Sequence, residues 1–210
     1  MARSESPDPK AYKREYKKIS TNEYLNGEPA EEEAFPCSCK PAADGTKCGD
    51  PAVCLNAATR WECPESCNEA VAAQGKCINQ RIQKGIKTKL AVKEAGRKGW
   101  GLFTQQEFTP GNFIIEYVGE IINQKEMEQR KHKYTQKDIR KDQQVKRFFM
   151  QLNQHQFVDA KIKGNKSRFL NHSCFPNCKT EKWTVAGVDR VVVVAAAAIP
   201  VGAELTIDYG

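Results

Sequence analysis

The alternation of apolar and polar positions predicts a chain that is mostly β, with short helices. Brief apolar or β-branched runs occupy residues 89–92, 101–104 and 113–117, and Thr109-Pro110-Gly111 supplies a turn before the last of them. Short runs of this kind, bounded by glycine and proline, are typical of strands rather than of helices. Residues 148–152 and 157–159 show the same pattern and predict a hairpin.

The C-terminal third repeats this pattern over longer stretches. Residues 180–185 and 190–198 predict an antiparallel pair joined by a turn at residues 186–189. The unbroken apolar run at residues 191–194 predicts a strand buried on both faces. Pro200-Val201-Gly202 then turns the chain into a final strand.

Other stretches predict helices or irregular structure. Asn123 and Glu126 resemble the start of a capping box, and the charged stretch up to about residue 142 is expected to be partly helical. A short helix is expected at residues 163–170. The first 36 residues are polar and charged, and Tyr12 and Tyr16 are spaced to share one helix face. Two interpretations of this region stay open: an arm that orders on contact and a flexible tail.

Residues 37–77 hold seven cysteines and few large apolar side chains. So small a core does not fold without cross-links or metal. An odd number of cysteines argues against a closed disulfide set, whereas structural zinc binds tetrahedral sets of thiolates and contributes folding free energy. Two separate sets need eight ligands, so seven suffice if one is shared. We predict two zinc ions that share Cys48, one held by Cys37, Cys39, Cys48 and Cys54 and one by Cys48, Cys63, Cys67 and Cys77.

Charge and hydropathy limit the expected partners and compartment. The formal net charge of +7 favours acidic partners such as nucleic acid, or else reflects a merely soluble surface. The longest apolar run, residues 191–199, is about half of a bilayer crossing, so no membrane is expected as a partner. The N-terminus lacks the apolar core of a secretory signal. We therefore expect a reducing compartment and interpret the cysteines as thiolate ligands.

The stretch from Arg168 to Cys178, R-F-L-N-H-S-C-F-P-N-C, mixes polar, thiol and apolar groups. Asn-His-Ser alone is typical of a loop with a hydrogen-bonded buried histidine. The full string, together with E-L-T-I-D-Y at residues 204–209, resembles the motifs of SET-domain protein-lysine methyltransferases. In that fold the closing segment passes through a loop beside the N-H-S-C stretch and forms a pseudoknot. The resemblance implies that Asn171, His172 and Tyr209 meet in space.

The cysteine-rich stretch resembles the AWS module that precedes the SET domain in a subset of this family. The implied fold is a SET-domain β-clip pseudoknot preceded by a cysteine-rich zinc-binding AWS module. The expected parts are an N-terminal arm or linker at residues 1–36, the AWS module at residues 37–83 and the SET domain at residues 84–210. The post-SET segment of relatives is taken to be absent from this chain.

The resemblance also implies site residues. Methyl transfer to lysine needs a neutral amine, although free lysine has a pKa of about 10.4, and a narrow apolar channel favours the neutral form. Tyr209 is the expected catalytic group, with Phe148 and Phe149 as candidate channel walls. Relatives usually carry one or more tyrosines in the segment before Met150, where this chain has Arg147-Phe148-Phe149. This departure bears on how many methyl groups are added and on activity. The residues expected to bind S-adenosylmethionine are Lys98, Gly99, Trp100, Arg147, Phe148, Asn171 and His172.

Some of these site residues also have simpler structural interpretations, and three further motif residues have expected roles outside the cofactor site. Residues 98–101 could form a plain turn, and Tyr209 could be an ordinary strand tyrosine. In relatives the cysteine that matches Cys174 joins three post-SET cysteines on a third zinc, so Cys174 is a metal ligand only with that segment present. Cys178 is expected to be a buried structural thiol, and Arg168 to support the pseudoknot rather than touch ligand.

Taken together, the sequence predicts an S-adenosylmethionine-dependent histone-lysine N-methyltransferase. By analogy with the AWS-containing branch, the expected substrate is histone H3 on nucleosomes, at the lysine-36 site, with nucleosomal DNA on the basic surface. We expect a monomer located in the nucleus, on chromosomes. One rival is a chromatin-binding pseudoenzyme, which Phe148 and Phe149 favour. The other is a zinc-dependent nucleic-acid-binding module, which would need neither motif.

Overall fold

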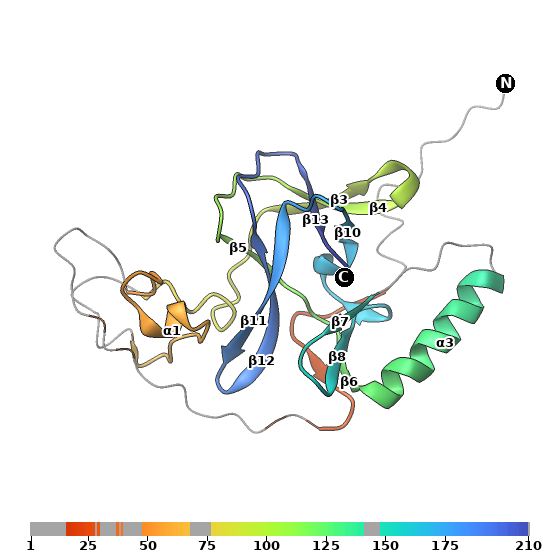
Figure 1. The fold of residues 1–210 in the computed structure, drawn as a ribbon, viewed down its shortest axis with the longest axis horizontal. Coiled ribbons are helices and arrows are strands. Elements are labelled where there is room, and N and C mark those ends of the chain that lie inside the picture. Colours follow the sequence, from red (N-terminus) through yellow and green to blue (C-terminus); the bar gives the residue numbers. More distant parts are fainter. Residues whose placement is uncertain are drawn as a thin grey trace.

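The structure is a computed structural model that describes residues 16–27, 29, 37, 39, 48–67, 77–140 and 148–209. These residues form mainly strands, gathered in small sheets, with few helices (Figure 1). The mostly β fold class is therefore confirmed. The cysteine-rich region lies at one side of the strands and a long helix lies at the other (Figure 1).

One four-stranded sheet contains the C-terminal strand. Its members are β3 (Leu90–Glu94), β4 (Trp100–Thr104), β10 (Asn171–His172) and β13 (Glu204–Ile207). They lie in the order β10-β13-β4-β3, in which only the β10–β13 pair is parallel. The 3₁₀ helix η3 (Gly96–Lys98) connects β3 to β4. The final strand thus lies between two segments that precede it in the sequence by many residues.

A three-stranded sheet forms the centre of the molecule. It contains β5 (Phe113–Glu116), β11 (Cys178–Val185) and β12 (Val188–Ala195), in the order β11-β12-β5. β12 confirms the strand predicted to be buried on both faces, since residues 191–194 are at most 3% exposed. The predicted turn is tighter than expected. Ala186 and Gly187 alone make it, with φ of 48° and 75°, the positive values of a type I′ hairpin turn.

The third sheet contains β2 (Glu23–Tyr24), β6 (Glu120–Asn123), β7 (Phe149–Gln151) and β8 (Gln156–Asp159), in the order β2-β6-β8-β7. Its β7–β8 pair is the predicted hairpin. A separate parallel pair joins β1 (Lys17–Lys18) to β9 (Lys163–Gly164). Residues from the predicted arm or tail, in β1 and β2, therefore belong to the sheets. Tyr16 leads into a strand rather than a helix, and Tyr12 lies outside the described residues.

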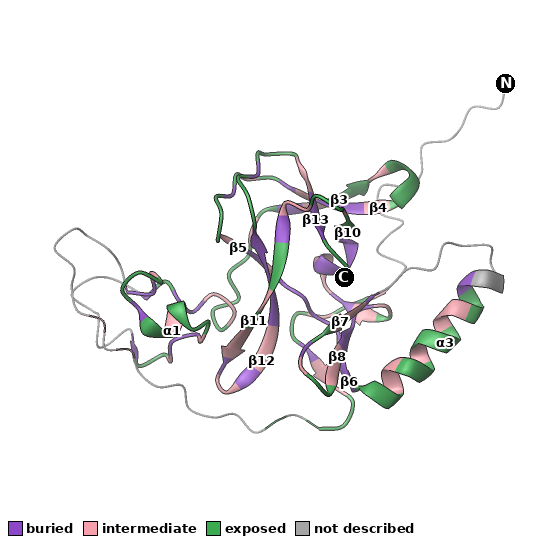
Figure 2. Cartoon of the chain, viewed as in Figure 1, coloured by how far each residue is buried: buried purple, intermediate pink, exposed green. Residues whose placement is uncertain are grey.

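The predicted helix after Asn123 is α3 (Gln124–Arg140). Asn123 caps it, because its Oδ1 accepts the backbone N–H of Glu126 at 2.9 Å. The Glu126 carboxylate does not close the capping box and instead accepts a hydrogen bond from Arg130 at 2.7 Å. The outer side of α3 is largely exposed (Figure 2).

The short helix predicted at residues 163–170 is only half correct. Lys163 and Gly164 form β9, and the helix is the single 3₁₀ turn η4 (Lys166–Phe169). Asn165 caps η4, because its Oδ1 accepts the backbone N–H of Ser167 at 2.9 Å. The first half is extended because β1, from the other end of the chain, pairs with it.

Apolar side chains from the sheets and from η4 form one main core, which Figure 2 shows as buried strand segments. The cysteine-rich region has a separate core made of cysteine side chains, next to the short helix α1 (Leu55–Ala58). This region docks on β11. Glu62 N–H donates to the Thr184 carbonyl at 2.9 Å, and the Arg60 side chain bonds both carboxylate oxygens of Glu181. In the described part of the chain, no helix is long and apolar enough to cross a bilayer.

Candidate active site and metal centre

The candidate active site forms where β10 meets β13. Asn171 pairs with Thr206 and His172 with Ile207 in parallel register, and the Ser173 N–H donates to the Ile207 carbonyl at 3.1 Å. These backbone bonds fix where the motif residues stand along the closing strand.

Asn177, at the other end of the motif, also binds β13 at this junction. Its Nδ2 donates to the Glu204 carbonyl at 2.8 Å, and its Oδ1 accepts the Thr206 N–H at 2.9 Å. One side chain thus satisfies two backbone groups of β13. Sequence reasoning did not single out Asn177, although it stands in the P-N-C end of the motif.

Tyr209 lies directly beside the motif. Its backbone N–H donates to Nδ1 of His172 at 3.3 Å, its ring centroid is 5.4 Å from the imidazole, and its hydroxyl donates to the Leu170 carbonyl at 2.6 Å. The predicted meeting of Asn171, His172 and Tyr209 is therefore present in the structure.

Burial, together with the nearby Glu204 charge, raises the pKa of Tyr209 to about 12. The phenol is therefore protonated at neutral pH and does not act as a general base there. Because its hydrogen points to Leu170, its oxygen lone pairs are available to accept a hydrogen bond from a neighbouring N–H group.

The predicted segment Lys98-Gly99-Trp100 also reaches this junction. Lys98 Nζ donates to the His172 carbonyl at 3.1 Å, and Asn171 Nδ2 donates to the Trp100 carbonyl at 3.3 Å. Gly99 has a φ of 78°, which is strained for side chains other than hydrogen. The turn is thus real, and it also brings three of the predicted cofactor residues to the motif.

Glu204 is a further polar group here that sequence reasoning did not single out. Its Oε1 accepts Asn171 Nδ2 at 2.7 Å. A Cβ placed on Gly101 would lie 2.8 Å from that oxygen and 3.1 Å from Asn171 Nδ2, so only glycine leaves room for this pair. The sequence signal was the glutamate at the start of E-L-T-I-D-Y.

The remaining predicted residues are less central. Phe148 is 9% exposed, and its ring lies 4.5 Å from the Arg168 guanidinium carbon. Phe149 instead stacks on Tyr134 of α3, with centroids 5.9 Å apart. The two rings therefore pack against different partners. Arg147 lies outside the described residues.

Two motif residues have the surroundings expected of structural groups. Arg168 is 6% exposed, and its Nε and Nη2 donate to the carbonyls of Ala160 and Lys161 at 2.9 and 3.1 Å. Cys178 is 1% exposed, and burial raises the pKa of its thiol to about 12. Neither presents a reactive group to solvent.

The seven cysteines of the N-terminal region gather in one cluster of free thiols. Groups of sulfur atoms within 4.8 Å of one another are Cys37, Cys39, Cys48 and Cys54; Cys37, Cys63 and Cys67; and Cys48, Cys67 and Cys77. The first group is the first predicted ligand set. Of the second set, Cys48, Cys67 and Cys77 group together, whereas Cys63 groups with Cys67 and Cys37.

This cluster suits a metal. A tetrahedral zinc with Zn–S bonds of about 2.3 Å separates sulfurs by about 3.8 Å. The Cys48–Cys67 sulfurs of the second predicted set are 3.6 Å apart, and the Cys37–Cys48 sulfurs of the first are 3.4 Å apart. Burial, with neighbouring thiols, raises the pKa of Cys39 and Cys67 to about 12, so these two thiols resist ionisation, whereas for Cys37 burial is outweighed by hydrogen bonds from neighbouring thiols, which lower its pKa to about 7. A bound cation would offset that cost, because metals bind the thiolate. Cys37, Cys48 and Cys67 each lie in two groups, so the groupings allow a shared ligand at Cys48 without singling it out.

Cys174 stands apart from this cluster. It is exposed, and its sulfur lies 3.5 Å from Nε2 of His172. On its other side, His172 Nδ1 is 3.5 Å from a carboxylate oxygen of Asp208. A thiol, an imidazole and a carboxylate thus share the open side of the junction.

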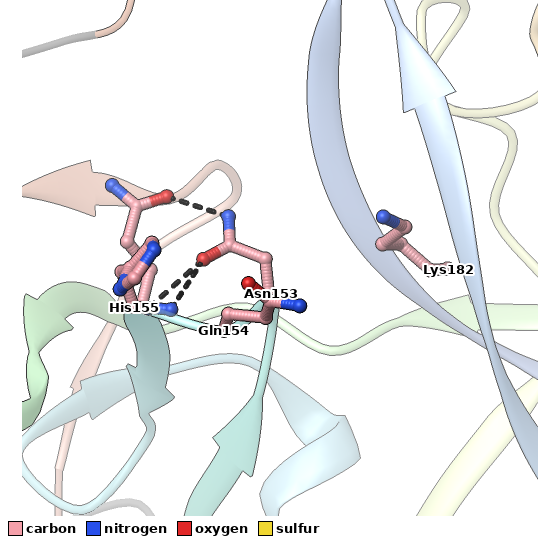
Figure 3. A pocket seen from close by; sticks show the side chains of 5 residues that line it. Asn153, Gln154, His155 and Lys182 are labelled. Carbon is pink, nitrogen blue, oxygen red and sulfur yellow. Dashed lines mark hydrogen bonds between the residues drawn. The ribbon is translucent and has the colours of Figure 1, made fainter.

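A surface hollow of about 500 Å³ lies elsewhere, between the β7–β8 turn and β11 (Figure 3). Its lining residues are Asn153, Gln154, His155, Gln156 and Lys182. The Asn153 amide is already bonded to Gln156 Oε1 at 3.0 Å and to the N–H groups of His155 and Gln156, as Figure 3 shows. These polar groups serve the turn, and none of the predicted site residues lines the hollow.

Comparison with known proteins adds independent information. The SET domain family matches residues 99–210. The chain is 38% identical to "Histone-lysine N-methyltransferase ASHH2" of Arabidopsis thaliana over 92% of its own length and 11% of that protein. It is 37% identical to "Histone-lysine N-methyltransferase, H3 lysine-36 specific" of Coccidioides immitis, over 85% of this chain and 17% of the relative. The chain thus spans less than a fifth of these curated relatives.

A solved structure supports the same comparison. "Chaetomium thermophilum Polycomb Repressive Complex 2 bound to GSK126" contains a chain that is 25% identical to this one, with a TM-score of 0.66. The match covers 83% of this chain and 24% of that one. A second structure of that complex, "Apo ctPRC2 in an autoinhibited state", is 24% identical with a TM-score of 0.67, over the same shares, and indicates the fold alone.

Proposed function

The chain belongs to the SET domain family, and on that premise we propose that it transfers methyl groups from S-adenosylmethionine to a lysine of histone H3 on nucleosomes. The observation that carries the proposal is the junction of Asn171 and His172 with the protonated phenol of Tyr209. Relatives named as H3 lysine-36 specific support the lysine-36 site as the target.

In this proposal Tyr209 is the catalytic residue. Bound S-adenosylmethionine would supply the methyl group from its sulfonium to a neutral lysine amine, leaving S-adenosylhomocysteine and a methylammonium that keeps its proton. The Tyr209 hydroxyl donates to the Leu170 carbonyl and accepts an amine N–H, which orients the nitrogen lone pair. The amine must arrive neutral, because the protonated phenol does not deprotonate it. Orientation of this kind accounts for a large part of a transfer barrier.

The proposed cofactor site is the surface around the junction. Lys98, Gly99, Trp100, Asn171 and His172 supply carbonyls, amides and an imidazole, a set that suits a zwitterionic amino acid joined to a purine. Hydrogen bonds from Lys98 to the His172 carbonyl and from Asn171 to the Trp100 carbonyl support their grouping. Phe148 and Arg147 complete the proposed set, with Phe148 and Phe149 as walls of the lysine channel.

We assign the cysteine-rich part, residues 37–83, as an AWS zinc module, followed by a SET domain at residues 84–210 and preceded by an arm at residues 1–36. Cys48 bridges two zinc ions, the first with Cys37, Cys39 and Cys54 and the second with Cys63, Cys67 and Cys77. The thiol groupings support a shared ligand within the cluster, since Cys37, Cys48 and Cys67 each belong to two groups. Cys174 takes a third zinc only together with a post-SET segment.

The proposed partners are the histone H3 tail and nucleosomal DNA, and the proposed location is the nucleus, on chromosomes, with the chain acting as a monomer. Support for DNA comes from α3, whose exposed positions include Lys125, Lys131, Lys133 and Lys137 against the single exposed acid Glu128. Such a surface attracts phosphate.

A pseudoenzyme is the alternative that one observation favours. Phenylalanines stand at residues 148 and 149, where the family pattern carries tyrosine, so a phenol is missing from its usual place. Turnover decides between the two proposals, because a pseudoenzyme binds nucleosomes without methylating them.

The direct test uses labelled S-adenosylmethionine and whole nucleosomes. Label should appear on histone H3 and be lost when the lysine-36 site is replaced by arginine. Label that persists on the replaced histone refutes the site, and nucleosome binding without any label supports the pseudoenzyme. Equal labelling by the Tyr209→Phe variant would remove Tyr209 from catalysis.

A further inference from the structure

A buried arginine lies directly behind the candidate active site. The Arg168 guanidinium carbon is 4.5 Å from the Phe148 ring, 4.6 Å from the Tyr16 ring and 4.9 Å from the Phe169 ring. Its Nε and Nη2 bind backbone carbonyls of residues 160 and 161. A buried cation held among aromatic faces is attracted to each of them, so the rings also fix its position.

One of these rings comes from outside the SET domain match, which covers residues 99–210. Tyr16 precedes β1, and besides facing Arg168 it makes an edge-on contact with Phe169, with centroids 5.7 Å apart. It therefore touches two consecutive residues of η4, the turn that leads into Asn171 and His172.

Residues 16–24, which include Tyr16, are hydrogen-bonded to the rest of the domain at several points. We call this segment the N-terminal strap. Lys17 and Ile19 N–H groups donate to carbonyls of Ile162 and Gly164, each at 2.8 Å. Further on, the Asn22 side chain accepts the Gly119 N–H at 3.0 Å. In Figure 1 the segment passes beside β6 and β8, in agreement with these bonds.

The side chain of Asn22 takes part in a second contact. It is 6% exposed, and its Nδ2 lies 3.4 Å from Oε1 of the buried Glu116. Lys163 adds an ion pair of 2.7 Å to Glu23 of the strap. The strap is thus attached to the domain at several points along its length, and these attachments fix the position of the Tyr16 ring.

A short path leads from Tyr16 to the reacting groups. Phe169 is followed by Leu170, whose carbonyl receives the Tyr209 hydroxyl at 2.6 Å, and then by Asn171. The Tyr16 ring packs on the Arg168 guanidinium, which in turn packs on the ring of Phe148, a proposed channel wall. A shift of η4 would therefore move the Tyr209 acceptor and the cofactor residues together.

We propose that Tyr16 is a positioning residue for the candidate active site and that the N-terminal strap belongs functionally to the catalytic domain. This inference rests on the proposed function. The ring closes one face of the Arg168 stack and so sets the position of η4, without touching substrate or cofactor.

The test compares three substitutions at Tyr16 with a control elsewhere. Tyr16→Phe keeps the aromatic face, whereas Tyr16→Leu keeps apolar bulk without it and Tyr16→Ala removes both. Val188→Ala is the control, because it trims a 7% exposed side chain beside the β11–β12 turn, outside the site. We expect kcat to fall about tenfold or more for Tyr16→Leu and Tyr16→Ala, and to stay within about twofold of wild type for Tyr16→Phe and Val188→Ala.

Hydrogen exchange provides a readout that does not need turnover. Amides of residues 166–173 should exchange faster in Tyr16→Leu and Tyr16→Ala but not in Val188→Ala, even where the variants lose similar thermal stability. Unchanged exchange there, or equal loss of kcat in Tyr16→Phe and Tyr16→Leu, overturns the positioning role. A wild-type chain that transfers no methyl group refutes the proposed function instead, and exchange then decides the positioning role by itself.

Discussion

At the scale of single residues, the site depends on side chains that satisfy the backbone of distant segments. The Asn177 side chain donates to the Glu204 carbonyl of β13. The Asn165 side chain donates to the Glu116 carbonyl at 2.9 Å, and the Tyr209 hydroxyl donates to the Leu170 carbonyl. Asn171, His172 and Tyr209 could be predicted to meet, because two whole motifs carried the resemblance. Asn177 and Glu204 lie in the same two motifs, but the motifs alone do not show which backbone or side-chain groups they bond. Tyr16 could not be predicted, because its partners lie far away in sequence and leave no local pattern.

The Tyr209 hydroxyl gives a sharp test of mechanism. Tyr209→Phe should lower kcat about 100-fold, the usual loss when one fixed hydrogen-bonding group at a reacting centre is removed. Affinity for S-adenosylmethionine should change less than about threefold, because the hydroxyl binds Leu170 and the amine. Steady-state kinetics and calorimetric titration measure the two effects. An equal loss in both would mean that the phenol mainly shapes the cofactor site.

Glu116 should make stability depend on pH. Burial raises its pKa from 4.5 to about 7, with the nearby Glu62 charge adding to the rise and Arg190 opposing it. The folded state then binds more protons than the unfolded state between these values, so the free energy of unfolding falls as pH rises through this window, by about 3 kcal/mol. That stability is fully present below the lower value.

Denaturant unfolding at pH 4.5 and pH 8 checks this expectation. Glu116→Gln should lose this part of the pH dependence, so its stability relative to wild type should improve by about 3 kcal/mol between the two pH values. Glu128→Gln, an exposed change on α3, should run parallel to wild type. Parallel curves for Glu116→Gln would show that this carboxylate titrates normally.

At the scale of elements, strand length decides what sequence could predict. β3, β4, β5, β11 and β12 were predicted within a few residues, because each has a run long enough to show its period. β1, β9 and β10 have two residues each, too few for any pattern. The sequence predicts helix where β9 lies, because the extended shape of β9 comes from pairing with β1.

α3 offers a prediction at this scale, because its Arg130 pairs with carboxylates of both β6 and β8. Arg130 bonds Glu120 at 2.8 Å, Glu126 at 2.7 Å and the fully buried Asp159 at 3.0 Å. Arg130→Ala leaves the Asp159 carboxylate with the Tyr134 hydroxyl and one backbone N–H, so it should cost about 3 kcal/mol of unfolding free energy. Lys133→Ala, exposed on the same helix, should cost under about 0.5 kcal/mol by the same denaturation measurement.

At the scale of the whole molecule, two cores of different kinds meet at β11. The strands bury apolar side chains, whereas the N-terminal region buries cysteine thiols. A compact cluster of cysteines could be predicted from composition, because so few apolar residues separate the thiols. Its contact with Glu181 and Thr184 could not be predicted, because it depends on how the two regions dock.

Metal removal should therefore act on one region first. Purified protein should contain two zinc ions per chain, and a chelator should expose amides of residues 48–67 while residues 191–194 stay protected. Elemental analysis and hydrogen exchange measure the two effects. Cys48→Ser should lose both ions and Cys174→Ser neither. Folded protein with almost no zinc would contradict the cysteine assignment.

The position of β13 between β10 and β4 has a consequence for synthesis. During translation, a ribosome that has not yet released residues 204–209 carries a chain whose β4 edge lacks its final neighbour. Nascent chains at that stage have an unpaired strand edge and an incomplete candidate active site. The junction of Asn171 and His172 with Tyr209 is therefore completed only once β13 has emerged and paired with β10.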